Sequence, residues 1–492
     1  MTQVENGFYP SADEFLLYAK TNKVIPVVKV IDGDMETPIS LFVKLKNSEN
    51  CFLLESAKID GRLDRYSIIG RNPYLTIKVE NEKVIVTDKN SVTEMTQNPY
   101  EVFNQIIEKY HCEQYQYAPR YFCGLTGYLG YDMIKYSEDL ELAAENELEI
   151  PDCMMSVPKE VIVYDHLKQK IYIIINCFFD EKVGGLTLSN FTNSITLIDI
   201  IEHEIINRKV SQKKHQNKVI KDQNFESNIT KEKFMENVNQ AKNYIYEGDI
   251  FQVVLSQRLK ANLGGTGFDF YRRLRNINPS PYMFYLDFDQ FSIAGTSPEM
   301  LVKVSDKVVE TVPIAGTRKR GINKEEDDRL EKELLSDQKE RAEHLMLVDL
   351  GRNDIGKVSA FDTVKVKNLM HVQKFSHVMH IVSNVEGKLS DRLTVIDALK
   401  SVMPAGTVSG APKIRAMEII DELETTKRGV YSGAVGYIGF DGEMDTCITI
   451  RTAVIKEGHV YMQAGAGIVA DSIPEKEYEE TLSKAAALLK AI

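Results

Sequence analysis

The sequence predicts an α+β fold with a largely antiparallel sheet. In the first part of the chain, short apolar runs rich in β-branched and aromatic residues alternate with turn clusters and only a few helical segments, which is typical of antiparallel strands. The later part mixes helical segments with strands interrupted by glycine. The apolar runs of the first part are "LFVKL", "YLTIKV", "KVIVTD", "VIVYD" and "KIYIIINCFF".

The chain of 492 residues is long enough for two or three domains. Residues 207–232 are polar, basic and weakly periodic, so we expect a surface connector there. It divides an N-terminal region, residues 1–206, from a C-terminal region, residues 233–492. A helix is expected from about Thr230 to Gly248, followed by the strand "IFQVVLSQRL".

The composition excludes several classes of protein. Hydrophobic residues make up 43% and charged residues 27%, as in ordinary globular proteins. A net charge of −12 argues against a nucleic-acid-binding protein. The N-terminus has neither the basic nor the apolar segment of a signal peptide, and no apolar run is long enough to cross a membrane. We therefore expect a cytoplasmic protein.

The six cysteines are scattered and form no CxxC pair. This spacing favours reduced cytosolic thiols over a disulfide framework or a zinc site. The chain also contains no GxGxxG or GxxxxGK[ST] loop, so no phosphate-binding motif is indicated.

The C-terminal segment "DSIPEKEYEETLSKAAALLK" predicts a helix with Ser472 as its N-cap. Glu477, Glu480 and Lys484 fall on one face of this helix. Like charges three residues apart repel mildly. The simplest interpretation is a solvated face containing one Glu–Lys pair.

A second predicted helix, in "DQKERAEHLMLVDLGRND", carries Glu340 and Glu343 at the same spacing. Their stripe continues into Leu347 and Leu350, so the acids extend an apolar face, where a charge is costly unless it is paired or bound to a metal. Four carboxylates on two helices would suit Mg²⁺, which is usually completed by oxygens of an anionic ligand. The alternative is pairing of Glu340 and Glu343 with neighbouring cations, namely Lys339, Arg341 and Arg352.

Several other polar groups lie at strand ends or bends. The turns "PIAGTRKRG" and "PAGTVSGAPK" offer backbone N–H groups and hydroxyls that can bind carboxylates. Arg451, between apolar neighbours in "TIRTAV", is expected on a strand as a carboxylate clamp. Glu299 could lie in the first turn of a helix. His380 lies in an apolar strand, where a lone histidine is more often a core residue.

Taken together, these segments resemble the chorismate-utilising enzymes, and among them the anthranilate synthase component I family. The resemblance covers nearly the whole chain and rests on long motifs: "EGDIFQVVLSQR", "GTSPEML", "ETVPIAGTRKRG", "KERAEHLMLVDLGRND", "VMHIVS", "PAGTVSGAPK", "GVYSGAVGYIG" and "AGAGIVADSIPEKEYEETLSKA". It implies a two-part α/β sandwich with large antiparallel sheets flanked by helices. Chorismate and Mg²⁺ would bind in the C-terminal region.

Carried over position by position, the resemblance implies a role for each site residue. The metal would be surrounded by Glu340, Glu343, Glu477 and Glu480. Lys484 would support the ring carboxylate of chorismate. The rest of the substrate would be held by Arg451, Tyr431, Gly465, Gly467, Thr407, Thr311 and Ala315. Glu299 would donate a proton to the leaving hydroxyl, and His380 would act in the later loss of pyruvate.

Two positions at which this chain differs from other members of the family indicate the nucleophile. Members that activate water carry a lysine where this chain has Gln252, and the 4-aminobenzoate branch carries a lysine where this chain has Ala315. Both differences favour ammonia as nucleophile and anthranilate as product. The alternatives are a 4-amino-4-deoxychorismate synthase component I, a salicylate or isochorismate synthase, and a non-catalytic binding protein that has kept the fold.

The N-terminal region resembles the family's regulatory part, which binds tryptophan as a feedback inhibitor. The motifs are "LLES" and "NPSPYMF". They imply a tryptophan site formed by Leu53, Glu55, Ser56, Asn278, Pro279, Tyr282 and Met283. Without the resemblance, "LLES" would be interpreted only as the end of a strand.

None of the cysteines lies in a GxCxG motif, so the chain has no glutaminase site of its own. The resemblance implies a separate glutamine amidotransferase subunit that supplies ammonia. A heterotetramer of two synthase and two glutaminase chains would be usual for the family.

Overall fold

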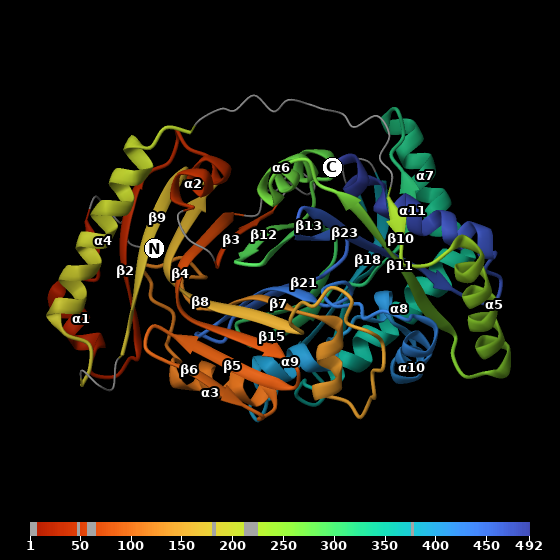
Figure 1. The fold of residues 1–492 in the computed structure, drawn as a ribbon, viewed down its shortest axis with the longest axis horizontal. Coiled ribbons are helices and arrows are strands. Elements are labelled where there is room, and N and C mark those ends of the chain that lie inside the picture. The colour runs from red at the N-terminus through yellow and green to blue at the C-terminus, as the bar shows by residue number, and fades with distance from the viewer. Residues whose placement is uncertain (1–6, 47–49, 57–64, 180–183, 211–224, 375–377) are drawn as a thin grey trace.

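The computed structural model describes residues 7–46, 50–56, 65–179, 184–210, 225–374 and 378–492. Most of the predicted connector lies outside these ranges. Mixed helices and antiparallel strands confirm the predicted α+β class (Figure 1). No described helix has both the length and the apolar character needed to cross a membrane.

Helices begin mostly at capping residues predicted by local sequence; Thr230, for example, accepts the backbone N–H of Lys233. The helices are α1 (Ala12–Tyr18), α2 (Pro38–Leu45), α3 (Pro99–Lys109), α4 (Leu188–Asn207), α5 (Lys231–Glu247), α6 (Gly267–Ile277), α7 (Lys324–Ser336), α8 (Gln338–Gly356), α9 (Val395–Val402), α10 (Lys413–Leu423) and α11 (Pro474–Lys490). Two 3₁₀ helices are η1 (Tyr131–Tyr136) and η2 (Gly406–Val408).

The strands pair antiparallel in one continuous network. Those before the connector are β1 (Phe8–Tyr9), β2 (Val24–Asp32), β3 (Cys51–Glu55), β4 (Tyr66–Glu80), β5 (Lys83–Asp88), β6 (Val92–Met95), β7 (Gly124–Leu129), β8 (Cys153–Asp165) and β9 (Lys170–Phe178). β10 (Glu226–Ser227) lies within the predicted connector. Those after the connector are β11 (Gln252–Asn262), β12 (Tyr282–Phe288), β13 (Phe291–Ser297), β14 (Met300–Ser305), β15 (Val308–Thr311), β16 (Ile314–Lys319), β17 (Lys365–Lys374), β18 (Val378–Lys388), β19 (Gly410–Ala411), β20 (Ala434–Gly439), β21 (Met444–Ile448), β22 (Thr452–Lys456) and β23 (His459–Ile468).

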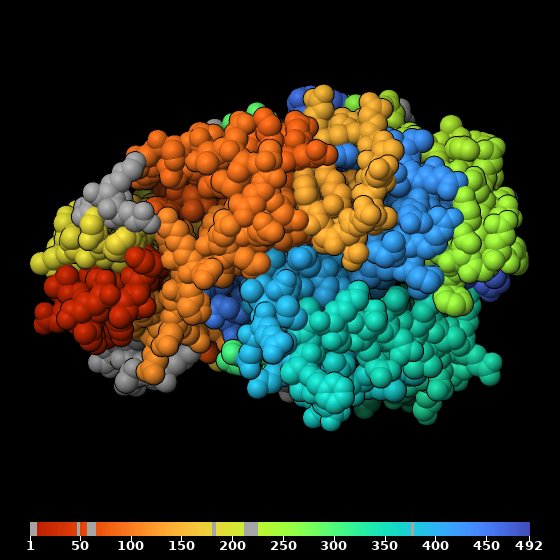
Figure 2. Space-filling model, turned by 90° about the horizontal axis from the view of Figure 1, so that it is seen from below, coloured from red at the N-terminus to blue at the C-terminus, as the bar shows by residue number. Residues whose placement is uncertain are grey.

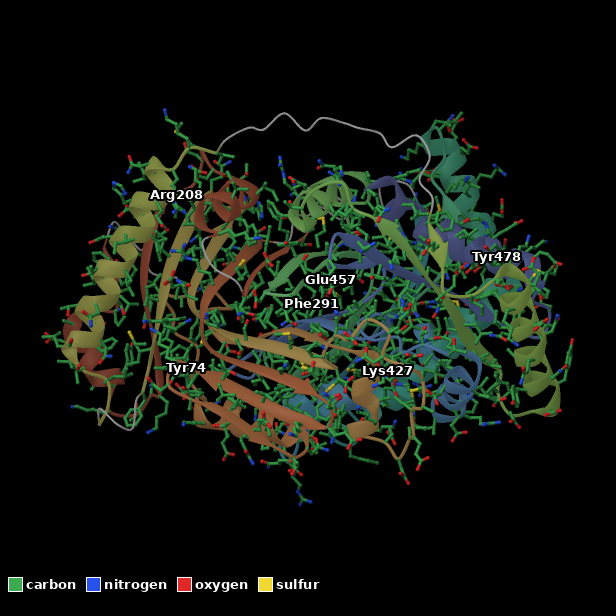
Figure 3. The ribbon with its side chains drawn as sticks, in the orientation of Figure 1. Tyr74, Arg208, Phe291, Lys427, Glu457 and Tyr478 are labelled. Atoms are coloured by element: carbon green, nitrogen blue, oxygen red, sulfur yellow. The ribbon has the colours of Figure 1, made fainter. Side chains whose placement is uncertain are left out.

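Strands from the two regions are interleaved. β3 pairs with β12, and β7 pairs with β20, so both regions contribute to the same sheets. Phe291, near the centre of Figure 3, packs against Tyr128 from β7 with ring centroids 6.1 Å apart. Figure 2 shows the orange N-terminal surface lying directly against the blue C-terminal surface. The regions predicted from the sequence therefore share one framework of strands.

Helices cover the outer faces of this framework. In Figure 1, α1 and α4 lie over β2 and β9 on one side, while α5, α10 and α11 lie beside β11 and β23 on the other. The apolar face of α5 packs on β11 through Phe234 and Val238, which are buried. α8 packs on β16 and β18. The helices that carry the predicted acids therefore rest on the strands that carry the other predicted site residues.

The pairing of β7 with β8 requires glycine, beside the place where β7 also meets β20 of the other region. A Cβ added to Gly127 would lie 2.0 Å from the backbone oxygen of Met154. We expect Gly127→Ala to lower the free energy of unfolding by about 1–3 kcal/mol, because the strands cannot separate without losing hydrogen bonds. Gly356→Ala is the control, since an added Cβ there meets nothing within 4 Å. Equal stability of both variants in denaturant titrations would contradict this prediction.

Candidate active site

Two strands form the base of the candidate site. β11 pairs with β23 so that Ser256 lies opposite Gly465 and Val254 lies opposite Gly467. A Cβ on Gly465 would lie 2.8 Å from the Tyr431 hydroxyl, and one on Gly467 would lie 2.4 Å from Nε2 of Gln252. The Tyr431 hydroxyl and the backbone oxygen of Leu255 leave little room for a side chain at Gly465, whereas a side chain at Gly467 would displace the Gln252 amide.

Gln252 begins β11 and is 5% exposed. Its Oε1 is buried and has no hydrogen-bond partner. A buried carbonyl without a donor carries the cost of its lost hydration. Gln252 therefore offers a neutral acceptor to a ligand that brings an N–H or O–H group.

The helix after β23 brings the predicted lysine and two acids to the same place. α11 begins at Pro474 with Ile473 as N-cap, so the prediction of Ser472 as N-cap is wrong; the Ser472 hydroxyl accepts the backbone N–H of Val469 instead. Lys484 donates to Gly465 O at 2.9 Å and pairs with Glu480 at 2.8 Å. Burial and the neighbouring Glu480 raise the pKa of Glu477, against the opposing effect of the Ser472 hydrogen bond.

α8 contributes the other pair of acids. Burial, with the charge of Glu340 next, raises the pKa of Glu343; Glu480 adds to this effect, and Lys484 opposes it. The acids of α8 and α11 are therefore close enough to interact. Glu340 pairs with Arg318 at 3.1 Å, a partner that sequence reasoning did not consider. Among the described residues, no group of three or more His, Cys, Asp or Glu side chains is arranged to hold a metal ion.

Glu299 lies between β13 and β14, so the expectation of a helix there is wrong. It is 7% exposed, and burial raises the pKa of its carboxyl to about 8. The nearby Thr407 side chain and the backbone of Ile314 oppose this rise. Glu299 is therefore largely protonated at neutral pH and can act as a proton donor.

Arg451 lies in the turn between β21 and β22 with φ of 51°, and not on a strand as expected. Burial lowers the pKa of its guanidinium, and no carboxylate of the described residues forms an ion pair with it. The charge of Arg451 also contributes to the lowered pKa of His380, although burial is the larger cause. An arginine in these surroundings is suited to binding a carboxylate supplied by a ligand.

His380 lies on β18, beside β16. Its Nδ1 is 3.0 Å from Gly316 O, which favours the tautomer that carries the proton on Nδ1. Ala315 lies on β16 opposite Ile381. Thr311 is placed differently from the others: its hydroxyl donates to Leu301 O, and its methyl group lies near Gly351 of α8.

A separate cavity of about 300 Å³ lies where β3, β12, β20 and β21 meet. Glu55, Ser56, Tyr282 and Met283 line it, as the sequence predicted, whereas Leu53, Asn278 and Pro279 do not. Leu53 faces the apolar core, and Leu54 lines the cavity instead. Other lining residues could not be found from the motifs, because strand pairing brings them in: Arg65, Tyr66, Arg120, Tyr121, Lys303, Val435, Tyr437, Asp445 and Cys447.

The Glu55 carboxylate is already bonded within the protein. It accepts the Tyr271 hydroxyl at 2.6 Å and Arg275 at 3.1 Å. Both oxygens of Glu55 therefore already have partners within the protein. Asp445, which accepts the Tyr282 hydroxyl and pairs with Lys303, supplies a carboxylate to the cavity wall.

Comparisons with known proteins identify the family and the fold of the chain. A family model described as chorismate binding enzyme matches residues 49–490. Anthranilate synthase component 1 of Acetivibrio thermocellus is 53% identical over 99% of this chain and 98% of its own length. The crystal structure of anthranilate synthase component I from Streptococcus pneumoniae has a TM-score of 0.75 and 39% identity, covering 94% of this chain and 99% of that one.

The menaquinone-specific isochorismate synthase of Escherichia coli has the same fold, with a TM-score of 0.69, 18% identity and 98% of each chain covered. The predicted two-part sandwich of antiparallel sheets and flanking helices is thereby confirmed. The long motifs noted in the sequence lie within the matched residues. The chain belongs to the chorismate binding enzyme family.

Proposed function

We propose that the chain is a cytoplasmic synthase subunit that converts chorismate and ammonia to anthranilate and pyruvate, the first step of tryptophan synthesis. Relatives named anthranilate synthase component 1, at 53% and 44% identity over nearly the whole chain, support this assignment. The observation that carries it is Arg451, a desolvated guanidinium without a protein carboxylate, close to His380. Chorismate has two carboxylates, and Arg451 with Tyr431 would bind that of the enolpyruvyl group.

The carboxylates of α8 and α11 fit Mg²⁺ in the chemistry of their donor atoms, because hard oxygen ligands suit this ion. Burial and neighbouring carboxylates raise the pKa values of Glu343 and Glu477, so a bound cation would favour their charged forms. Glu340 and Glu480 would complete the set. When bound, Mg²⁺ would neutralise these acids and hold the ring carboxylate of chorismate.

The protein's own residues would carry the proton transfers. Ammonia adds to C2 of the ring while the C4 hydroxyl leaves as water, with its proton supplied by Glu299, whose pKa of about 8 keeps it protonated. Gln252 accepts an N–H of the incoming ammonia at its unpartnered Oε1. His380, kept neutral by burial, then accepts the C2 proton as the C3–O bond breaks; the enolpyruvate that leaves takes up a proton at its methylene carbon and becomes pyruvate.

The cysteines support an external source of ammonia. All six are buried, and burial raises the pKa of Cys51 and Cys112 to about 12. A buried thiol with a raised pKa is a poor nucleophile. We therefore assign the release of ammonia from glutamine to a separate amidotransferase chain, in a heterotetramer with this one.

The cavity beside β3 and β12 is proposed to bind tryptophan as a feedback inhibitor. Its wall combines apolar groups, such as Met283 and Pro281, with hydroxyls and the carboxylate of Asp445. An indole ring requires the apolar groups, and an α-ammonium group requires the hydroxyls and the carboxylate.

The direct test is incubation of the purified chain with chorismate, Mg²⁺ and an ammonium salt. We expect fluorescent anthranilate and pyruvate in equal amounts. Glutamine in place of ammonium should give no product until a glutaminase subunit is added. Formation of 4-amino-4-deoxychorismate or isochorismate, or use of glutamine by the chain alone, would contradict the proposal.

Removal of one acid tests the metal assignment. We expect Glu343→Gln or Glu480→Gln to lower Mg²⁺-dependent kcat/KM by about 100-fold or more, because one charged oxygen ligand is lost. Mg²⁺ affinity measured by calorimetry in the presence of chorismate should fall in parallel. Glu479→Gln, on the exposed face of α11, is the matched control. Wild-type rates in both variants would refute the assignment.

Filling the cavity tests the regulatory proposal. Ser56→Phe places a ring where tryptophan would bind. Inhibition by tryptophan should therefore weaken by about 10-fold or more, with turnover in its absence nearly unchanged. Ser189→Phe, on the exposed surface of α4, is the control. A Ser56→Phe enzyme that is inhibited as strongly as wild type would show that tryptophan acts elsewhere.

A further inference from the structure

Arg428 was not among the residues singled out in the sequence, yet it lies behind the candidate active site. It is 3% exposed and lies between α10 and β20. A guanidinium has five N–H groups. The structure gives it five hydrogen bonds, to two backbone carbonyls, one serine hydroxyl and both oxygens of Glu424.

The two carbonyls belong to elements that carry predicted substrate or nucleophile residues. Arg428 donates to Val408 O at 2.7 Å, next to Thr407 in η2. It donates to Val254 O at 2.6 Å, two residues after Gln252 on β11. One side chain therefore fixes the separation between η2 and β11.

Arg428 also contacts the segment that carries the third predicted group. The centre of its guanidinium is 5.5 Å from the Tyr431 ring centroid, and its Nη1 is 3.3 Å from the Ser432 hydroxyl. The centre of the guanidinium is also 4.9 Å from the Tyr131 ring centroid. Tyr431 is thereby held between Arg428 and the backbone of Gly465, which its hydroxyl approaches.

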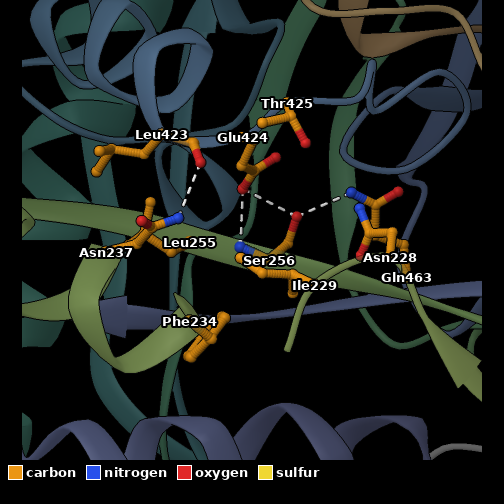
Figure 4. Close-up of a pocket in the computed structure, with 10 residues that line it drawn as sticks. All are labelled: Asn228, Ile229, Phe234, Asn237, Leu255, Ser256, Leu423, Glu424, Thr425 and Gln463. Atoms are coloured by element: carbon orange, nitrogen blue, oxygen red, sulfur yellow. Dashed lines mark hydrogen bonds between the residues drawn. The ribbon is translucent and has the colours of Figure 1, made fainter. Parts of the chain in front are cut away.

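Glu424 neutralises the charge of Arg428 and connects it to Ser256 on β11. Its Oε1 accepts the backbone N–H of Ser256 at 2.8 Å and the Ser256 hydroxyl at 3.0 Å, as Figure 4 shows. Gln463 on β23 donates to the same hydroxyl. Between its pairings with β19 and β10, this edge of β11 is bonded by the side chains of Arg428 and Glu424, which fixes the strand that carries Gln252.

We propose that Arg428 and Glu424 form a positioning pair that sets the substrate-binding geometry by locking η2, β11 and Tyr431 to one another. The inference rests on the proposed function, since it assumes that chorismate binds against these elements. A lysine could replace the charge of Arg428, but it has three donors and no planar fork, so it cannot satisfy the same acceptors. Neither residue is expected to touch the reacting atoms.

The test is Arg428→Lys in the full chain. We expect KM for chorismate to rise by about 10-fold or more, with a smaller change in kcat, because the groups that bind the substrate are displaced while Glu299 and His380 remain. Glu424→Gln is the second variant. It keeps an acceptor for Ser256 but removes the charge that Arg428 requires, and it should change KM in the same direction.

The chain offers a matched control in Arg71. It is also 3% exposed and pairs with a buried acid, Glu160, at 2.7 Å, but it lies among β4, β8 and α4. Arg71→Lys should lower the melting temperature to a similar extent without changing KM. If Arg71→Lys and Arg428→Lys lower stability equally and both leave KM unchanged, the positioning role is wrong.

A double-mutant cycle with Tyr431→Phe gives a second readout that a purely structural role would not change. The effects of Arg428→Lys and Tyr431→Phe on KM should be non-additive, whereas Arg71→Lys and Tyr431→Phe should be additive. Additive effects for Arg428 would overturn the coupling. A wild-type chain that makes no anthranilate contradicts the proposed function instead; chorismate affinities by calorimetry then decide the role of Arg428.

Discussion

The pairing of β11 with β23 is the interaction on which the candidate site depends. It places Gln252 against Gly467 and Tyr431 against Gly465, where an added Cβ would force these side chains to move. Because α11 follows β23 almost directly, the same pairing determines where Lys484 meets Gly465 O. Loss of the β11–β23 register would therefore separate the predicted nucleophile site, the substrate-binding tyrosine and the acids of α11 together.

On this base, the molecule gathers charges that it does not fully neutralise. Glu343 and Glu477 have raised pKa values, and Arg451 has a lowered one, so each would gain from a partner of opposite charge. A dianionic substrate together with a divalent cation would supply both kinds of partner. Arg428 differs from Arg451. Burial lowers the pKa of the Arg428 guanidinium, but the paired Glu424 outweighs this effect, so the pKa is raised. The fully paired arginine is suited to holding structure, and the unpaired one to holding a ligand.

The sequence predicted the elements well where the signal is local. Spacing along a helix placed Glu340 with Glu343 and Glu477 with Glu480, and the predicted helix start near Thr230 was correct. The sequence-based predictions failed where a contact between residues farther apart decides the conformation. Ser472 bonds to Val469 instead of capping α11, and Arg451 adopts φ of 51° in a turn, which its β-branched neighbours do not indicate. Arg318 of β16 reaches Glu340 on α8, and Arg428 reaches Val254 O on β11, which is distant in sequence; no periodicity reveals such contacts.

Strand interleaving also explains how the cavity and the candidate active site can share one element. Asp445 and Cys447 of β21 line the cavity. The next residue, Ile448, donates its N–H to Glu299 O at 3.1 Å and accepts the Ser297 hydroxyl at 2.6 Å. An occupant that displaced β21 would therefore reach the proposed proton donor through a single backbone hydrogen bond. Because β21 also pairs with β14 and β20, such a displacement would be resisted on both sides, and the strand would move as a unit with its neighbours.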